Sequence, residues 1–195
     1  MKKILYLLGC ILTFPHYLIY YFLKPDIKDI IDSDIDEMNK RGHLQRNLTF
    51  YLLFHRPYRN LFYYRIGHQR ARWLRLFLKE YPSFFISPNV KHIGSNAYVL
   101  SHPYSTIVNA KSIGNNFSIC QLTTIGNKRN GRNDLVPSIG DNVTLGANVN
   151  IIGEVTIGNN VIIGAGSVVV KDVPDNCIIA GNPAKIIKYL TPKRK

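Results

Sequence analysis

An aliphatic residue returns at every sixth position along the second half of the chain. The first series comprises Ile107, Ile113, Ile119 and Ile125, and the same phase resumes at Ile139 and continues to position 169. A helix does not repeat every six residues, and strand alternation alone does not place Gly and Asn at fixed positions between the aliphatic ones. The pattern therefore predicts short flat strands whose aliphatic side chains point into a narrow core. Gly and Asn are expected at the corners, because both tolerate left-handed backbone conformations.

Six-residue units of this kind build a prism. Three strands make one coil, and stacked coils pair every strand with the strands above and below it. About ten units predict three to four coils, and the segment "FISPNVKHIGSNAYVLS" at 85–101 is expected to add an earlier one. The chain is thus predicted to be mainly β, with a parallel β-helix as its main body.

The repeat is interrupted between Ile125 and Ile139, where the step is fourteen residues instead of six. The stretch "NKRNGRNDLVPS" at 127–138 is rich in Gly, Asn and Pro, and it is predicted to be a loop outside the prism. Long loops in regular solenoids are usually functional. Three basic side chains of this loop are candidates for contact with an anionic ligand: Lys128, Arg129 and Arg132. A solvated, variable loop is the alternative.

The N-terminal segment 1–24 is strongly apolar. Residues 4–23 contain no charged side chain, which is long enough to cross a bilayer, but Pro15 and His16 interrupt the run. A cleaved signal peptide is disfavoured because no small-residue cleavage site follows. The aromatic composition and the basic flank favour an interfacial helix pair, kinked at Pro15, over a spanning anchor. A helix buried against a partner subunit is the alternative.

Residues 25–82 are predicted to be a basic helical region. The stretch "DIKDIIDSDIDEMNK" spaces its apolar residues on one helical face, at positions 27, 30, 31, 35 and 38. The following stretch mixes arginine with aromatic residues and suits either an anionic membrane or nucleic acid. Its alternative is an amphipathic helix whose arginine stems cover the end of the next domain. His43, His55 and His68 fit no metal motif and are expected to be surface or packing residues.

Charge and composition narrow the class of protein. The 195 residues carry a net charge of +13, and the stretch 41–79 has nine Lys or Arg and no Asp or Glu. Anionic partners are therefore expected. Apolar residues make up 46% and charged residues 19%, which excludes a disordered chain. The three cysteines are widely spaced and match neither a disulfide framework nor a zinc site, so a reducing cytoplasm fits best.

Two stretches resemble a known family: "HPYSTIVNAKSIGNNFSICQLTTIG" and the later "PSIGDNVTLGANVNIIGEVTIGNNVIIGAGSVVVKDVPDNCIIAGNPAKII". They are similar to the hexapeptide-repeat acyltransferases, and more narrowly to serine acetyltransferases and their capsule-cluster relatives, over roughly residues 85–190. The resemblance implies a left-handed parallel β-helix acetyltransferase domain over 83–190, preceded by the small α-helical N-terminal region and followed by a basic tail at 191–195. It also implies a homotrimer with active sites between subunits.

Acetyl transfer from a thioester to a hydroxyl needs a base, a group that holds the oxyanion and a groove for CoA. The resemblance implies that His102 in "LSHPYSTIV" is the catalytic base, a role that suits histidine because its pKa lies near neutral pH. A corner histidine bonded to backbone is the alternative. His92 is the other histidine near the coils, at a phase expected to point outward, and is a weaker candidate.

Two positions depart from the serine acetyltransferase pattern. Ser101 stands where the family carries an aspartate before the base, and Val136 stands where it carries a second histidine that recognises serine. Nothing acidic lies between Glu80 and Asp134, so the group that orients His102 is Glu80, Asp134 from a neighbouring subunit, or a backbone carbonyl. The second departure weakens the assignment of serine as the acceptor.

For CoA, the resemblance points to the edge formed by "LGAN" and "IGAGS", where small residues let pantetheine approach the backbone: Gly146, Ala147, Ala165 and Gly166. Lys171 and Lys185 are the candidates for the adenosine phosphates. No catalytic metal and no nucleic-acid partner are expected, and metal-dependent CO₂ hydration is set aside because the coils hold only two histidines.

The predicted function is an acetyl-CoA-dependent O-acetyltransferase. Its expected acceptor is a hydroxyl of a surface or capsular polysaccharide sugar or of its precursor, because the N-terminal region is short, basic and apolar. The alternative is serine O-acetylation, and a non-catalytic β-helix scaffold is less favoured. The expected location is the cytoplasm, with contact between residues 1–80 and the inner face of the membrane as an open question.

Overall fold

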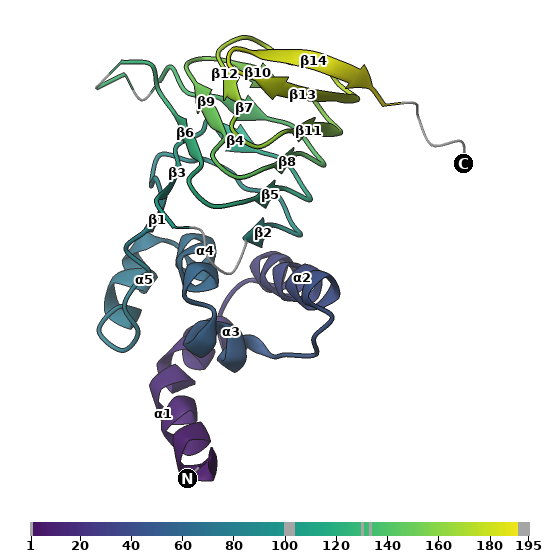
Figure 1. Cartoon of the computed structure of the whole chain (residues 1–195). Helices are drawn as coiled ribbons and strands as arrows, with labels where there is room; N and C mark the ends of the chain where they lie inside the picture. The colour runs from purple at the N-terminus through teal and green to yellow at the C-terminus, as the bar shows by residue number, and fades with distance from the viewer. Residues whose placement is uncertain (1, 100–103, 130, 133, 191–195) are drawn as a thin grey trace.

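The computed structural model describes residues 2–99, 104–129, 131–132 and 134–190, together with all their side chains except those of 2–7 and 99. Helices lie below one end of a prism of short strands, and the N-terminus is far from the last strands (Figure 1). The five helices are α1 (Lys2–Tyr21), α2 (Pro25–Gly42), α3 (Leu48–Phe54), α4 (Arg56–Ile66) and α5 (His68–Leu74).

The strands form three sheets, named here sheets A, B and C, which are the three walls of the prism. Sheet A contains β1 (Phe84–Ile86), β3 (Thr106–Val108), β6 (Thr124–Gly126), β9 (Asn150–Ile152) and β12 (Val168–Val169). Sheet B contains β4 (Ser112–Ile113), β7 (Ser138–Ile139) and β10 (Thr156–Ile157). Sheet C contains β2 (Tyr98–Val99), β5 (Ser118–Ile119), β8 (Thr144–Leu145), β11 (Val161–Ile163), β13 (Cys177–Gly181) and β14 (Ala184–Tyr189).

The predicted left-handed β-helix is confirmed. Successive strands visit sheets A, B and C in turn, and each pairs in parallel with strands one coil away. Isolated bridges at Ile93 and Val173 complete sheet B in the first and last coils, so the prism has about five turns. β14 departs from the repeat, because it folds back antiparallel on β13 and ends the solenoid.

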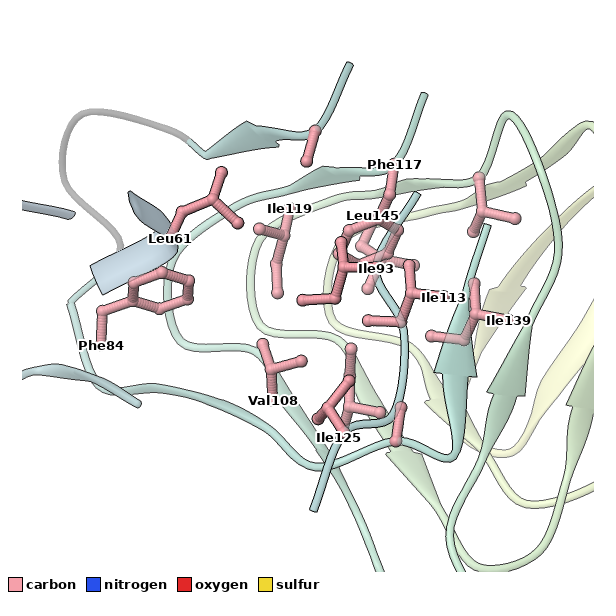
Figure 2. Packing of buried hydrophobic residues seen from close by; sticks show 14 of the residues in the cluster. Leu61, Phe84, Ile93, Val108, Ile113, Phe117, Ile119, Ile125, Ile139 and Leu145 are labelled. Atoms are coloured by element: carbon pink, nitrogen blue, oxygen red, sulfur yellow. The ribbon is translucent and has the colours of Figure 1, made fainter. Parts of the chain in front are cut away.

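The inward side chains stack in columns of identical or similar shape. In sheet B the column contains Ile93, Ile113, Ile139 and Ile157, each at most 4% exposed. Figure 2 shows three of these isoleucines side by side, facing residues from the other two walls. Complete burial of such a side chain contributes about 1.5–3 kcal/mol, so the columns supply the main stabilisation of a prism whose strands are only two or three residues long.

The expected inward position of Ile107 is wrong. Ile107 is 45% exposed, whereas its neighbour Val108 is 2% exposed and pairs in register with Ile125. The six-residue spacing fails here because the step from Val108 to the next inward residue, Ile113, is five positions instead of six. The outward Ile107 is in register with Phe85 of β1, which is 52% exposed.

Asparagine occupies the corner between sheets B and C in every coil. Five residues of this column adopt the left-handed conformation with φ between 54° and 57°: Asn96, Asn116, Asn142, Asn160 and Asn176. Each side-chain amide donates to the amide oxygen of the next, at 2.9, 2.7, 2.9 and 2.9 Å in chain order. This asparagine ladder confirms the prediction that Asn marks the corners, and it adds a continuous hydrogen-bonded spine that the repeat alone did not indicate.

Buried polar contacts join the helices to the first coils. Asp34 of α2 is fully buried, pairs with Arg65 of α4 at 3.0 Å, and accepts the Ala97 backbone N–H at 2.8 Å. The same guanidinium donates to the carbonyl of Gly94 at 2.7 Å. Arg41 lies over the Tyr98 ring and donates to the Ser118 hydroxyl at 3.1 Å. The helical region therefore lies in fixed contact with sheet C.

The segment expected to form a helix pair is instead one helix, α1, with Pro15 inside it. In the part of the chain that the structure describes, no helix combines the length and apolar character needed to cross a membrane. His16 of α1 is fully buried, with Nε2 3.0 Å from the Tyr63 hydroxyl. That hydroxyl donates to the carbonyl of Leu78 at 2.5 Å, so the His16 Nε2–H is the donor to it. Burial lowers the pKa of His16 to about 4, and the ring is neutral at pH 7.

Candidate active site

The corner between sheets C and A carries the features of a ligand-binding edge. Its left-handed positions are Ser105, Leu122, Asn148 and Gly166, one in each of four successive coils. The residues immediately before them form a second column, which becomes smaller from the first coil to the last: Tyr104, Gln121, Ala147 and Ala165. We refer to these eight residues as the C–A corner. In the last two of these coils the backbone is exposed, because only the small side chains of Ala147 and Ala165 cover it.

Backbone hydrogen bonds hold the C–A corner in register. The N–H of each left-handed residue donates to the carbonyl of the residue below it in the second column: Leu122 to Tyr104, Asn148 to Gln121, and Gly166 to Ala147, at 2.8–2.9 Å. None of the backbone hydrogen bonds found in the described part of the chain uses the N–H of Ala147 or Ala165. Ala165 is exposed and Ala147 is half-buried, so both N–H groups are available to a carbonyl acceptor.

The small residues at this corner are required by coil stacking as well. A Cβ at Gly146 would lie 2.7 Å from the backbone nitrogen of Ala165, and one at Gly164 would lie 2.9 Å from the Ala180 Cβ. Gly166 has φ of 71° and open space around it. The four residues predicted to contact CoA, at positions 146, 147, 165 and 166, therefore lie together on two adjacent coils.

His102 lies outside the described residues, as do its neighbours 100–103. Of the described residues on either side, Val99 is the last residue of β2 in sheet C, and Tyr104 is the first residue of the C–A corner.

Gln121 and Leu122 are features of the C–A corner that the sequence analysis did not identify. The Gln121 side-chain oxygen Oε1 is buried and has no hydrogen-bond partner, a situation that costs about 1–3 kcal/mol for a neutral acceptor. Leu122 adopts a left-handed conformation with φ of 61° although it is neither Gly nor Asn. Unsatisfied acceptors and backbone strain of this kind concentrate at functional sites. The only sequence signal was the departure of "QL" from the Gly/Asn corner pattern.

Cys120 precedes these residues and is half-buried. Burial raises the pKa of its thiol, an effect that the positive charge of Arg41 partly offsets. The thiol is therefore protonated at neutral pH, and its position at the corner does not make it a reactive nucleophile.

The two candidate phosphate-binding lysines lie at the closing end of the prism. Lys171 and Lys185 both line a cavity of about 170 Å³ formed by the segment after β12 and the start of β14. Lys185 pairs in register with Ala180, whose Cβ is in line with Gly164 on the coil below. The cavity thus lies at the last coil, and its Lys171 belongs to the turn from β12 of sheet A to Val173 of sheet B rather than to the C–A corner.

The loop at 127–138 lies at a different corner. It leaves the prism after β6 of sheet A and returns at β7 of sheet B. Lys128 is exposed and its Cβ lies near Gly153, whose N–H donates to Gly126 at 2.9 Å. Arg129 and Arg132 are exposed as well. Within one chain, the described residues of this loop therefore lie away from the C–A corner.

Both candidate carboxylates for orienting His102 already have cationic partners. Asp134 accepts two hydrogen bonds from Arg132 at 2.8 and 2.9 Å, and these bonds lower the pKa of its carboxyl to about 2. Glu80 pairs with Arg75 at 2.6 Å. Val136, at the position of the family's second histidine, is buried and offers no polar group.

The remaining histidines behave as predicted. His92 is exposed, in agreement with its outward phase. His43 ends α2 in a left-handed conformation, and His68 begins α5 on the surface. The His55 Nδ1 accepts the Tyr58 backbone N–H at 3.2 Å and so caps α4. These side chains serve packing and helix ends.

Comparisons with known proteins agree with the repeat and with the overall architecture. Residues 137–171 match the family model described as bacterial transferase hexapeptide, six repeats. Serine acetyltransferase 2 of Arabidopsis thaliana is 31% identical over 173 residues, which cover 84% of this chain and 53% of that protein. The colanic acid biosynthesis acetyltransferase WcaB of Escherichia coli K12 is 44% identical over 90 residues, which cover 46% and 55%.

A solved structure extends the likeness to most of the fold. The serine acetyltransferase of Neisseria gonorrhoeae superimposes with a TM-score of 0.73 at 28% sequence identity, covering 87% of this chain and 69% of that one. The chain spans about half the length of the curated relatives it matches.

Proposed function

We propose that this chain, whose repeat and β-helix fold resemble those of the hexapeptide-repeat transferases, is an acetyl-CoA-dependent O-acetyltransferase. The observation that carries the proposal is the C–A corner. Two stacked coils expose small residues and unused backbone N–H groups there, and Tyr104, which directly follows residues 100–103 in the sequence, belongs to the same corner. The amide carbonyls of pantetheine match these N–H groups, and the bare corner admits the chain without a clash.

In the proposed reaction, His102 takes the proton from the acceptor hydroxyl. The hydroxyl oxygen then attacks the thioester carbonyl, and the carbon–sulfur bond breaks as the tetrahedral intermediate collapses. The proton held by His102 passes to the departing thiolate, so the acetyl ester and free CoA are the products. A backbone N–H of the corner holds the oxyanion. His102→Ala should lower kcat by a hundredfold or more, in line with the loss of a general base.

Gln121 is the proposed acceptor for a donor group of the bound thioester substrate. Its buried oxygen lacks a partner, and an amide N–H of pantetheine would provide one. Gln121→Leu should raise the KM for acetyl-CoA while leaving the midpoint of thermal unfolding unchanged or higher, because removal of an unpaired buried acceptor does not destabilise the fold. An unchanged KM would remove Gln121 from the site.

Lys171 and Lys185 are proposed to bind the phosphates of the adenosine moiety. A sharp test compares acetyl-CoA with its analogue that lacks the 3′-phosphate. The wild-type enzyme should prefer acetyl-CoA, and Lys171→Ala or Lys185→Ala should reduce that preference, because charge-assisted contacts to phosphate are lost. Lys188→Ala on the same strand is the control and should keep the preference.

The proposed acceptor is a sugar hydroxyl of a surface polysaccharide or its precursor. One feature supports a sugar over serine. Val136 is buried and apolar where a serine-recognising histidine would stand. The 44% identity with WcaB over 90 residues points the same way.

Serine O-acetylation is the second candidate, supported by the longer alignment with the serine acetyltransferases and by the shared architecture. The deciding experiment measures release of CoA with a thiol reagent for L-serine and for nucleotide- and lipid-linked sugars. Turnover with sugars alone supports the first proposal, and turnover with serine alone replaces it. No release with any hydroxyl acceptor, together with no binding of CoA, would leave a scaffold role instead.

We also propose that the active unit is a homotrimer. The loop at 127–138 and the C–A corner lie at different corners of one prism, so the loop of one subunit reaches such a corner only on a neighbour. Light scattering of the purified chain tests the stoichiometry. If the chain is a monomer at full activity, the loop takes no part in the site.

A further inference from the structure

The polarity of α1 is inverted relative to an ordinary surface helix. Its solvent-facing side is apolar, with Leu8, Ile11, Phe14 and Leu18, together with Phe22 directly after the helix, between 50% and 75% exposed. We call these five residues the outer face of α1. On the opposite side, Thr13 and His16 are at most 1% exposed. A helix that packs on a soluble protein normally turns its apolar stripe inward and its polar residues outward.

Specific contacts hold α1 in this orientation. His16 is hydrogen-bonded to Tyr63 of α4, and the Tyr17 hydroxyl accepts from the Thr49 side chain of α3 at 3.1 Å. At Gly9 the helix lies so close to α3 that a Cβ would be 2.6 Å from Leu53 Cδ1. Rotation of α1 to bury its outer face would break these contacts. The outer face is therefore held exposed by specific contacts, and we expect a binding partner to bury it.

The surface beside the outer face is basic and aromatic. α1 contacts α5, and α5 with the turn after it exposes Trp73, at 64%, and Leu76, at 75%. Arg70, Arg72 and Lys79 are exposed in the same stretch, and the Arg72 guanidinium lies 5.9 Å from the centre of the Trp73 ring. No Asp or Glu occurs between positions 41 and 79. Exposed apolar side chains flanked by arginine and tryptophan are typical of a surface that meets lipid headgroups.

One carboxylate of α2 lies on the inner side of α1. Asp32 accepts a hydrogen bond from the Tyr20 hydroxyl at 2.8 Å. Tyr20 follows Thr13 and His16 along the inner side of the helix, so this contact places the Asp32 carboxylate away from the outer face. The exposed charges of α5, Arg70 and Arg72, are positive.

We propose that the outer face of α1 and the adjoining surface of α5 dock onto an anionic lipid bilayer, with α1 lying along the interface. The apolar outer face enters the boundary between headgroups and acyl chains, and the exposed basic side chains meet anionic headgroups. A second copy of the chain is a poorer cover. Pairing of the same surface on two copies would bring two basic regions together.

The test measures partitioning of the full-length protein onto sedimented vesicles of phosphatidylcholine, with and without phosphatidylglycerol. The wild-type protein should bind the anionic vesicles more strongly than the neutral ones, and added salt should weaken binding. Ile11→Glu on the outer face should lower the partition coefficient by about tenfold, because one aliphatic side chain no longer enters the bilayer.

Ile187→Glu is the matched control, because Ile187 is the same residue type with similar exposure, 67% against 61% for Ile11, and lies on β14 far from α1. This variant should partition within about twofold of the wild-type protein. Circular dichroism checks that both variants are folded. Equal binding to neutral and anionic vesicles, or unchanged partitioning of Ile11→Glu, would overturn the proposal. A change in molar mass of Ile11→Glu with no change in vesicle binding would assign the outer face to a second copy instead.

Discussion

The asparagine ladder predicts a measurable stabilisation at its middle rung, Asn142. Its side chain accepts from Asn116 at 2.7 Å and donates to Asn160 at 2.9 Å, while its backbone has φ of 57°. Two neutral hydrogen bonds contribute about 1 kcal/mol each. Asn142→Gly removes both and keeps the left-handed backbone free of strain, so it should cost about 2 kcal/mol. Asn142→Ala should cost about 3 kcal/mol, because alanine adds about 1 kcal/mol for the left-handed conformation.

Asn148 separates the ladder from the backbone effect. It has the same φ of 57° at the C–A corner, and none of the side-chain hydrogen bonds found in the described residues involves its amide. Asn148→Ala should therefore cost about 1 kcal/mol and Asn148→Gly about zero. Urea unfolding followed by circular dichroism, at one protein concentration, measures all four variants. Equal stability of Asn142→Gly and Asn148→Gly would refute a stabilising ladder.

Three further predictions concern single positions. The pKa of His16 is about 4 in the folded state against an ordinary 6.5, so the unfolded chain binds more protons between these pH values. The free energy of unfolding should therefore fall by up to about 3 kcal/mol as the pH falls through that window. His16→Leu should remove this part of the pH dependence in urea titrations, and the same pH dependence of the unfolding free energy in both proteins would contradict the prediction. Leu122→Asn should raise stability by about 1 kcal/mol by relieving the left-handed leucine, and thermal unfolding that shows a loss would argue against strain there. Asp34→Ala should destabilise the fold by about 3–5 kcal/mol, because Arg65 would keep its buried charge without a partner, and a loss below about 1 kcal/mol would mean that the pair does not anchor α2.

The sequence predicted the prism because its core positions are chemically repetitive. Ile113, Ile139 and Ile157 occupy the same wall because one residue type recurs at one spacing. The prediction failed at Ile107, because the chain enters its second coil with a step of five positions from Val108 to Ile113, and a six-residue repeat does not predict that local change. The apolar composition of the α1 segment does not determine which side of the helix faces the protein. Its contacts with Tyr63 and Thr49 determine this orientation.

Part of the candidate site was expected from the family resemblance. The resemblance pointed to the small residues at positions 146, 147, 165 and 166, and the structure brings these residues onto adjacent coils. Gln121 was not predicted because its distinguishing property is a buried side-chain oxygen without a hydrogen-bond partner, and burial of one atom cannot be inferred from a sequence pattern. The proposed meeting of loop and corner in a trimer depends on contacts between subunits, which the periodicity of one chain does not encode.

The loop at 127–138 has a consequence for how this protein can change over evolutionary time. Ser138 pairs with Ser112, 26 positions earlier, and with Thr156, 18 positions later, yet the wall of sheet B and the asparagine ladder run on without interruption. The entropy lost on closing a loop grows only with the logarithm of its length. Lengthening the separation between paired strands from 18 to 26 residues therefore costs about 0.3 kcal/mol. Insertions at this corner therefore cost little stability, so the length and charge of this loop can change while the folded body stays the same.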